Sequence, residues 1–149
     1  MLYSKADSPT LGFLGKALSL ELSAVQLYST QAKLVGVWGF DEIAKKLSDE
    51  AGEEMVHADR IIARMVGLGV VPNASQLRPV RLGNNVQELL LYNHEFENEV
   101  ISLYTTAAKH CAAVGDHDNR LFFESLLLEE QAHAKALLEW LHQLKQSQV

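Results

Sequence analysis

The chain has 149 residues, of which 48% are hydrophobic and 21% charged, so it can bury a core as one domain spanning 1–149. Its 13 Lys and Arg against 19 Asp and Glu argue against a nucleic-acid partner, because phosphate binding requires surplus basic side chains. The single cysteine, Cys111, excludes an intrachain disulfide and a CxxC metal site. No apolar run is long enough for a signal peptide or a membrane span, so we expect a cytoplasmic protein with no membrane partner.

The first two predicted helices cover residues 8–37 and 41–66. Ser8 is interpreted as the cap residue of the first helix, with Pro9 in the first helical position, and Trp38-Gly39 follows its end. Apolar side chains recur every three or four residues along both helices, which is typical of one buried helix face. They are Leu11, Leu14, Leu18, Val25 and Tyr28 in the first helix, and Ile43, Leu47, Ala51, Ala58, Ile61 and Met65 in the second.

The next segment, residues 67–83, has no helical period and contains Pro72, Pro79 and three glycines. Fully extended, about 16 residues reach ~50 Å, whereas a helix of about 26 residues is only ~39 Å long. This segment is therefore long enough to cross a helical bundle from end to end.

Two further helices are predicted over residues 85–114 and 118–145. Asn85, with Glu88 three positions later, resembles a capping box. The apolar stripes comprise Leu89, Leu90, Ile101 and Tyr104 in the third helix, and Leu121, Leu126, Leu127, Leu137 and Leu141 in the fourth. Because almost no sequence remains for strands, the predicted fold is an all-α four-helix bundle with a long crossover between the second and third helices.

Four glutamates interrupt the apolar stripes, and no basic residue accompanies them there. They are Glu21, Glu54, Glu97 and Glu130. Four carboxylates directed at one core would repel one another and resist the loss of hydration, unless a cation neutralises them. The pattern therefore indicates a metal site.

The spacing of two histidines supports this interpretation. His57 and His133 each follow a stripe glutamate by three residues, so each pair shares one helix face. Thirty-three residues separate Glu21 from Glu54, and the same number separates Glu97 from Glu130; each residue of the second pair lies 76 after its counterpart in the first. Residues equidistant from the turn of an antiparallel hairpin lie side by side, which predicts all four glutamates at one level of the bundle.

The six candidate ligands, four carboxylates and two imidazoles, are what two metal ions in a bundle core require. This donor set fits iron or manganese, with zinc as a competitor. A third Glu-x-x-His match, Glu139 with His142, lacks both spacings and lies on the opposite face of its helix, so we interpret it as solvated surface.

Several of these segments resemble the bacterioferritins, over about residues 10–145. The similar segments are Glu54 to Arg60 (EMVHADR), Leu20-Glu21-Leu22 with Tyr28, the Trp38-Gly39 turn, Val71-Pro72-Asn73, and Glu129 to His133 (EEQAH). The resemblance implies a di-iron ferroxidase centre that oxidises two Fe(II) with dioxygen or peroxide, followed by storage of the ferric mineral inside a homo-oligomeric cage. By position, Glu54 and Glu130 would bridge the irons, Glu21 and Glu97 would be terminal carboxylates, and His57 and His133 terminal nitrogen ligands.

Two other residues acquire roles only through this resemblance. Met55 follows Glu54 by one residue and so points ~100° away from it; a methionine there is most often an interface filler. The resemblance implies instead a haem at the twofold axis of a dimer, with Met55 as its axial ligand. Ala51 and Gly52, one turn earlier, would leave space for it. Part of the pocket wall would come from the first helix, through Leu22, Val25, Gln26 and Ser29. Tyr28 would lie beside the di-iron centre and tune or reduce it, and a purely structural core tyrosine is the alternative.

The size of the cage is a separate expectation. Bacterioferritins usually continue into a fifth helix that lines the pores of a 24-subunit cage, and this sequence ends at Val149, soon after the predicted fourth helix. We therefore expect a twelve-subunit shell in preference to the larger one.

Two functions of other kinds also fit the residues. A di-iron oxidase or peroxidase of the rubrerythrin type, which stores nothing, is the first, although the rubredoxin-type cysteines are missing. The second is a structural or DNA-protecting shell protein whose metals only stabilise the bundle; the acidic charge and the lack of a basic tail count against it.

Overall fold

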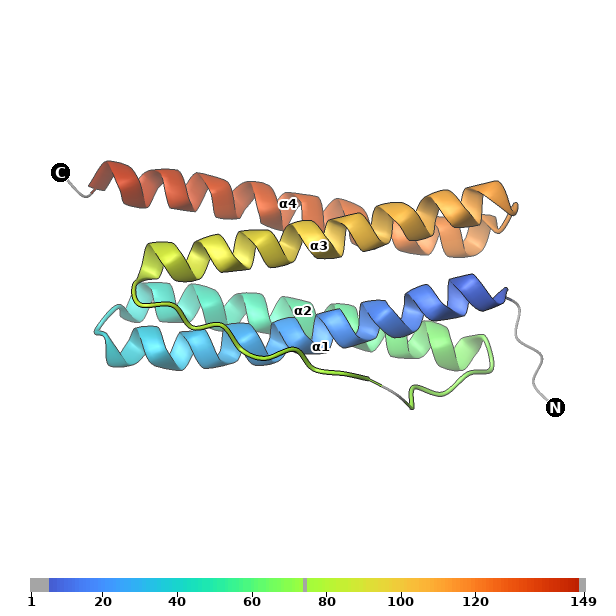
Figure 1. Ribbon diagram of the computed structural model, residues 1–149, viewed down its shortest axis with the longest axis horizontal. Helices are drawn as coiled ribbons and strands as arrows, with labels where there is room; N and C mark the ends of the chain where they lie inside the picture. The colour runs from blue at the N-terminus through green and yellow to red at the C-terminus, as the bar shows by residue number, and fades with distance from the viewer. Residues whose placement is uncertain (1–5, 74, 148–149) are drawn as a thin grey trace. The chain divides into compact units, whose positions relative to one another are not determined.

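The computed structural model describes residues 6–73 and 75–147 and is built from four α-helices (Figure 1). They are α1 (Ser8–Val37), α2 (Asp41–Gly67), α3 (Val86–Ala113) and α4 (His117–Ser147). The predicted helix bounds differ from these by two residues at most, and no strand occurs among the described residues. The chain divides into two compact units, Met1–Leu82 with α1 and α2, and Gly83–Val149 with α3 and α4.

The first unit is an antiparallel hairpin of α1 and α2, and glycine makes its tight turn possible. Gly39 has φ 91°, a left-handed conformation that costs other residues energy. The amide of Phe40 donates to the carbonyl of Val35 at 3.1 Å, and the amide of Gly39 donates to that of Gly36 at 3.0 Å. This pair of bonds satisfies carbonyls at the end of α1 that have no partner within the helix.

The cap of α1 differs from the prediction. Asp7, not Ser8, precedes the first helical residue, and its carboxylate accepts a hydrogen bond from the amide of Thr10 at 2.9 Å. Both residue types cap helices well, but a carboxylate also interacts favourably with the positive end of the helix dipole. Assigning Ser8 as the cap was therefore wrong by one residue.

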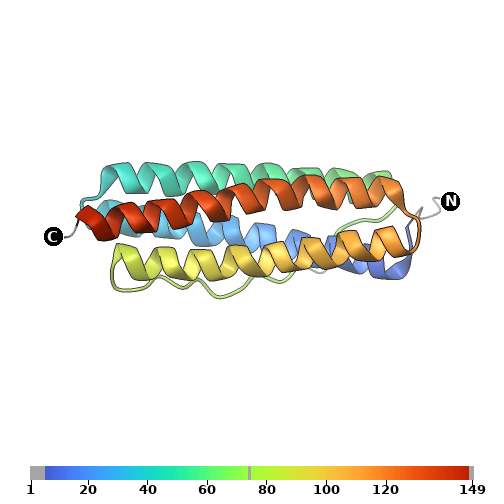
Figure 2. The same ribbon diagram turned by 90° about the horizontal axis from the view of Figure 1, so that it is seen from above.

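The second unit is the corresponding hairpin of α3 and α4, seen from above in Figure 2. Gly115 at the turn has φ 75°, and the amide of Asp116 donates to the carbonyl of Cys111 at 2.9 Å. At the start of α3 one half of the predicted capping box is confirmed, since Asn85 Oδ1 accepts from the amide of Glu88 at 2.8 Å. The other half is wrong, because the Glu88 carboxylate accepts from the hydroxyl of Tyr92 at 2.8 Å instead of from the amide of Asn85.

One predicted core position of α4 is wrong. Leu121 is 56% exposed, whereas Phe123 and Leu126 are fully buried. Leu121 precedes Phe123 by two residues and so lies about 200° from it around the helix, which means that the two side chains cannot share the inward face.

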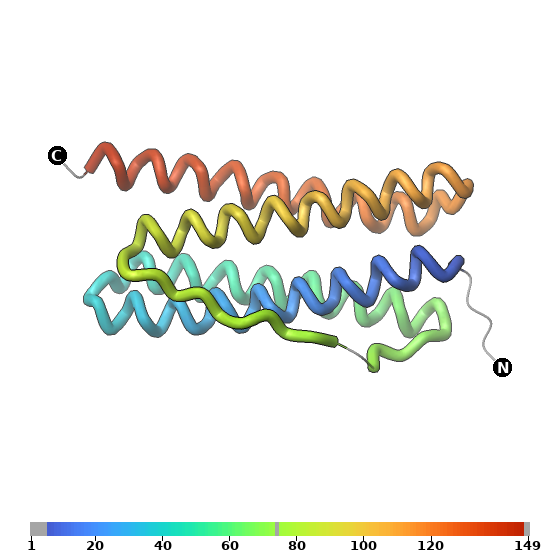
Figure 3. The backbone as a smooth tube through the Cα atoms, in the orientation of Figure 1, coloured from blue at the N-terminus to red at the C-terminus, as the bar shows by residue number. Residues whose placement is uncertain are grey.

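The crossover extends along α1 in a non-helical conformation (Figures 1 and 3). Polar side chains of α1 bind its backbone at three points. The bonds are Gln76 N–H to Ser19 Oγ at 3.0 Å, Arg78 N–H to Ser23 Oγ at 3.0 Å, and Gln31 Nε2 to the Arg81 carbonyl at 3.1 Å. These contacts explain why Ser23 and Gln31 are polar although they are buried.

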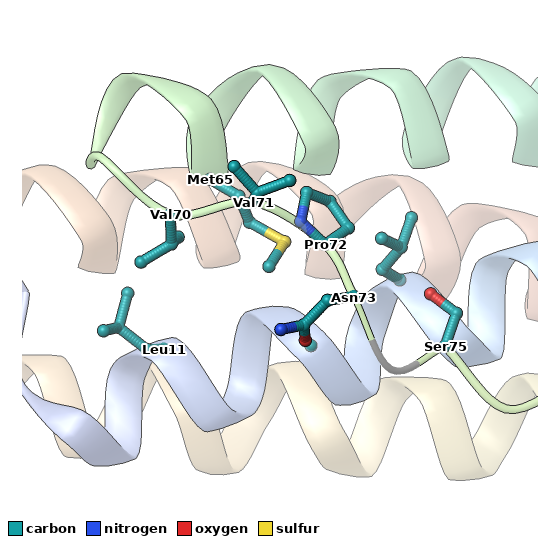
Figure 4. A pocket seen from close by; sticks show the side chains of 9 residues that line it. Leu11, Met65, Val70, Val71, Pro72, Asn73 and Ser75 are labelled. Atoms are coloured by element: carbon teal, nitrogen blue, oxygen red, sulfur yellow. The ribbon is translucent and has the colours of Figure 1, made fainter.

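A pocket of about 460 Å³ lies between α1, the end of α2 and the start of the crossover (Figure 4). Its lining is mostly apolar and comprises Leu11, Gly15, Leu18, Met65, Val70, Val71, Pro72, Asn73 and Ser75. The side chain of Met65 points from α2 into this space. None of the predicted site residues lines the pocket.

Within the described part of the chain, no helix has an apolar stretch of the length that spanning a membrane requires.

Candidate metal centre

In the first unit, α1 and α2 bring together three of the predicted ligands. Glu21, Glu54 and His57 each place one oxygen or nitrogen within 4.8 Å of the others. His57 Nδ1 lies 3.2 Å from Glu21 Oε2, within hydrogen-bond distance, and 3.6 Å from Glu54 Oε1. All three residues are at least 96% buried. The hairpin thus forms a half-site of two carboxylates and one imidazole.

In the second unit, α3 and α4 form a half-site of the same composition. Glu97, Glu130 and His133 also each offer one ligand atom within 4.8 Å of the others. His133 Nδ1 lies 3.8 Å from Glu130 Oε2. The His133 side chain is 26% exposed, compared with 5% for that of His57, so solvent reaches the imidazole of this unit more readily.

The apolar stripes explain why the glutamates face inward. Leu47 and Ile61, seven residues on either side of Glu54, are fully buried, and so are Leu90 and Tyr104 on either side of Glu97. A side chain two turns from such residues on both sides shares their helix face. The third Glu-x-x-His match lies outside this pattern, and both Glu139 and His142 are exposed, as predicted.

The electrostatics of the buried carboxylates favour a cation. Glu54 Oε1 and Oε2, Glu97 Oε2 and Glu130 Oε2 accept no hydrogen bond within the described residues, although each residue has other interactions. A carboxylate buried in this way is costly unless positive charge accompanies it. Carboxylate oxygens and imidazole nitrogens together suit iron, manganese or zinc, so the residues present fit the predicted metals.

Met55 lies outside the first half-site, as its position in the helix predicts. It is 37% exposed, whereas the preceding residue, Glu54, is 1% exposed. Gly52, one turn earlier, is also exposed. On α1 the predicted wall residues are half-buried or exposed, and they are Leu22, Val25, Gln26 and Ser29. The surface around Met55 is therefore accessible to a ligand in this chain.

Two buried tyrosines accompany the half-sites. Tyr28 follows Glu21 by seven residues, and Tyr104 follows Glu97 by seven; their exposures are 1% and 0%. The Tyr104 ring packs against that of Phe123, with 6.3 Å between centroids. The sequence prediction treated Tyr104 only as a core residue, although the 76-residue shift that relates the ligands also relates it to Tyr28.

Comparisons with known proteins agree with this description. Residues 12–147 match the family model of the ferritin-like domain. The bacterioferritin of Rhodobacter capsulatus is 39% identical over 89% of this chain and 83% of its own length, and that of Brucella melitensis is 34% identical over 87% and 80%. A solved structure of the Rhodobacter capsulatus protein, with a metal-free dinuclear site and a haem iron in a crystallographic special position, superposes with a TM-score of 0.91 at 37% identity.

That superposition covers 95% of this chain and 89% of the other. It confirms the predicted fold class, an all-α ferritin-like four-helix bundle with a long crossover between the second and third helices. Together with the identity to curated relatives, it establishes that the chain belongs to the bacterioferritin family of ferritin-like proteins.

Proposed function

We propose that the two units act as one ferritin-like domain whose half-sites together bind two iron ions, and that the protein is a ferroxidase and an iron store. The observation that carries this proposal is the repeated triad, two glutamates and a histidine converging within 4.8 Å in each unit. In the assignment we propose, Glu54 and Glu130 bridge the irons and the remaining four residues each bind one iron. These four are Glu21, His57, Glu97 and His133.

The substrate of the reaction is Fe(II), and each half-site supplies ligands that favour the ferric product. Four carboxylates add negative charge, which stabilises Fe(III) more than Fe(II). Two Fe(II) ions each lose one electron to dioxygen, which takes up two protons and leaves as hydrogen peroxide; with peroxide as oxidant, two protons are consumed and two waters form. When His57 binds iron through Nδ1, any proton that this nitrogen shares with Glu21 must leave.

Iron retention after aerobic Fe(II) loading and desalting tests the storage function. We expect far more iron than the two ions per chain that the six ligands hold, eluting together with a large assembly. About two irons per chain would instead indicate a di-iron oxidase without a storage cavity. The control is a variant in which Glu139 and His142 are replaced with alanine, and it is expected to retain as much iron as the wild type. This exposed pair has the same Glu-x-x-His spacing but lies outside the half-sites.

We also propose that haem binds beside Met55, with one Met55 from each of two chains as axial ligands. Support comes from the Rhodobacter capsulatus relative, whose haem iron occupies a crystallographic special position, which by definition lies on a symmetry element. In this chain a thioether ligand is available on an accessible part of α2. When bound, the haem would supply a one-electron redox group.

Reconstitution with haem tests this role of Met55. We expect the Met55→Leu variant to lose the absorption spectrum of the wild-type reduced haem, because leucine has no sulfur to coordinate iron. Met65→Leu, which changes a buried methionine of the same helix, is the control and keeps the spectrum. Indistinguishable spectra of wild type and Met55→Leu would remove Met55 as the axial ligand.

Assembly into a twelve-subunit shell through such dimers completes the proposal. A closed shell is what a mineral store requires, since the ferric product would otherwise precipitate. The cytoplasmic location expected from the sequence stays a prediction.

A further inference from the structure

We propose that Asn93 is a positioning residue of the second half-site, and that its carboxamide donates a hydrogen bond to the Glu97 carboxylate when metal is bound. This inference rests on the proposed ferroxidase function and deepens it, because it names a residue of the site that is not itself a metal ligand. The observations behind it are the burial of Asn93, its place on α3 and a difference between the two halves of the internal repeat.

Asn93 is an unfavourable residue for its position. It is 0% exposed in the interior of α3, where asparagine is a poor helix former because its side chain competes with the backbone for hydrogen bonds. Burial of a carboxamide adds a second cost unless new hydrogen bonds replace those that it made to water. A residue that carries both costs serves a purpose that an apolar side chain at the same position could not serve.

Other buried neutral polar side chains of the described chain belong to its connections between helices. Ser23 and Gln31 bind the crossover, and Asn119 Nδ2 donates to Asp116 at 2.7 Å where α4 begins. Asn93 has a different place, because it lies about two turns inside α3 and four residues before a predicted ligand. Its surroundings along the helix therefore point to the metal centre.

The helix geometry places Asn93 beside Glu97. Residues four apart on a helix are neighbours, with about 5–6 Å between Cβ atoms, and amide–carboxylate pairs at this spacing form hydrogen bonds. Both residues belong to the buried stripe that continues to Val100, so both side chains face inward. A carboxylate that binds a metal through one oxygen has a second oxygen left to accept. A neutral N–H donor can satisfy that oxygen without cancelling the charge that attracts the metal.

The internal repeat indicates that this donor is specific to one half-site. The 76-residue shift that relates the ligands relates Asn93 to Ala17, which is also fully buried. Glu21, the counterpart of Glu97, instead has His57 Nδ1 at 3.2 Å from its Oε2. The outer glutamates of the two half-sites are thus supported differently, and we expect the loss of Asn93 to affect chiefly one of the two bound ions.

Anaerobic titration with Co(II) tests the proposal. Iron-free and haem-free protein is used, because the visible absorption of Co(II) then reports each bound ion and its ligands without any oxidation step. We expect the wild type to bind about two ions per chain, as the six ligands require. In Asn93→Ala we expect one of them to bind about 10–100-fold more weakly, which is the usual effect of removing a group that orients a metal ligand. Asn93→Gln keeps the carboxamide and should recover part of the lost affinity.

Two further asparagine variants serve as controls. Asn119→Ala removes another buried asparagine of the same unit, whose hydrogen bonds go to Asp116. We expect it to lower the free energy of unfolding and to leave the Co(II) affinity unchanged, which separates a positioning role from a merely structural one. Asn98→Ala changes an exposed residue directly after Glu97 and is expected to leave the Co(II) affinity unchanged as well.

Wild-type affinity for both ions in Asn93→Ala overturns the proposal, and so does an equal loss of affinity in Asn119→Ala. Should Asn93→Ala fail to fold, Asn93→Leu is tested against the same expectation, because leucine has a side chain of similar length and no donor. Wild-type protein that fails to bind a second Co(II) overturns the proposed di-iron centre as well. Tight binding of both ions that does not depend on Asn93 overturns this inference alone.

Discussion

A buried glutamate carries an energetic cost that its own helix cannot offset. Glu97 is 3% exposed on a stripe whose next residues in either direction, Val100 and Asn93, are fully buried. Such a residue is retained when positive charge neutralises it. The groups that converge on Glu97 in its half-site are the His133 imidazole and the Glu130 carboxylate, and the second carboxylate adds negative charge. A cation at this point would therefore serve stability and chemistry together.

Replacing Glu97 with alanine tests the role of an individual ligand. We expect the initial rate of Fe(II) oxidation to fall at least about tenfold, because one iron loses a carboxylate that fixes its position. The rate is measured by stopped-flow absorbance of the ferric product. The control is Glu99→Ala, an exposed position on the same helix. A variant that oxidises Fe(II) as fast as the wild type would show that the assigned centre is wrong.

At the scale of elements, the two hairpins repeat one design. Gly39 and Gly115 occupy the two turns at positive φ, and they are separated by the same 76 residues as the ligands. Each turn sets the register of its hairpin, and the register decides which residues of the paired helices lie at one level. The turns therefore bring each glutamate pair together although no turn residue is itself a ligand.

Substitution of Gly115 with alanine isolates this effect. We expect the free energy of unfolding to fall by about 1 kcal/mol, because a Cβ disfavours φ 75° while nothing within 4 Å obstructs it. Gly12→Ala is the matched control, since its Cβ also meets nothing and its backbone is helical; it is expected to stabilise by about 0.5–1 kcal/mol. Urea unfolding measures the free energy of unfolding of both variants. Equal effects of the two substitutions would contradict the view that the positive φ at Gly115 disfavours a Cβ.

The attachment of the crossover to α1 leads to a second prediction at this scale. Ser23 Oγ accepts from the amide of Arg78 and donates to the carbonyl of Ser19 at 2.7 Å. Ser23→Ala should therefore cost about 1 kcal/mol and accelerate hydrogen exchange of the Arg78 amide. Ser29→Ala, an exposed serine of the same helix, should change neither. Unchanged exchange at Arg78 in Ser23→Ala would mean that this contact does not hold the crossover.

At the scale of the whole molecule, the proposed function depends on assembly. A shell of twelve chains of 16.6 kDa has a mass of about 200 kDa, and one of 24 chains about 400 kDa. We expect light scattering on a size-exclusion column to give the smaller value. A mass of about 400 kDa would overturn the preference for twelve subunits, and a small oligomer would favour the non-storing oxidase.

A gel shift at low salt tests the expected lack of nucleic-acid binding, which the charge of −6 predicts.

Much of the fold could be predicted because helices and their ends depend on local sequence. The three-to-four-residue period, the Asn85 cap and the turn glycines each act within a few residues, and the structure confirms the four helices from these signals. The errors were local as well. Two adjacent capping residues, Asp7 and Ser8, competed at the start of α1, and Leu121 is apolar yet faces solvent.

The sequence by itself determined the helices and, through the 33- and 76-residue spacings, the six candidate ligands, because regular geometry converts residue spacing directly into position. Only the tertiary structure decided the path of the crossover along Ser19, Ser23 and Gln31, the pocket beside Met65, and the contact of His57 Nδ1 with Glu21. A non-helical segment has no period from which its path can be predicted, and side-chain contacts between helices depend on rotamers that packing selects.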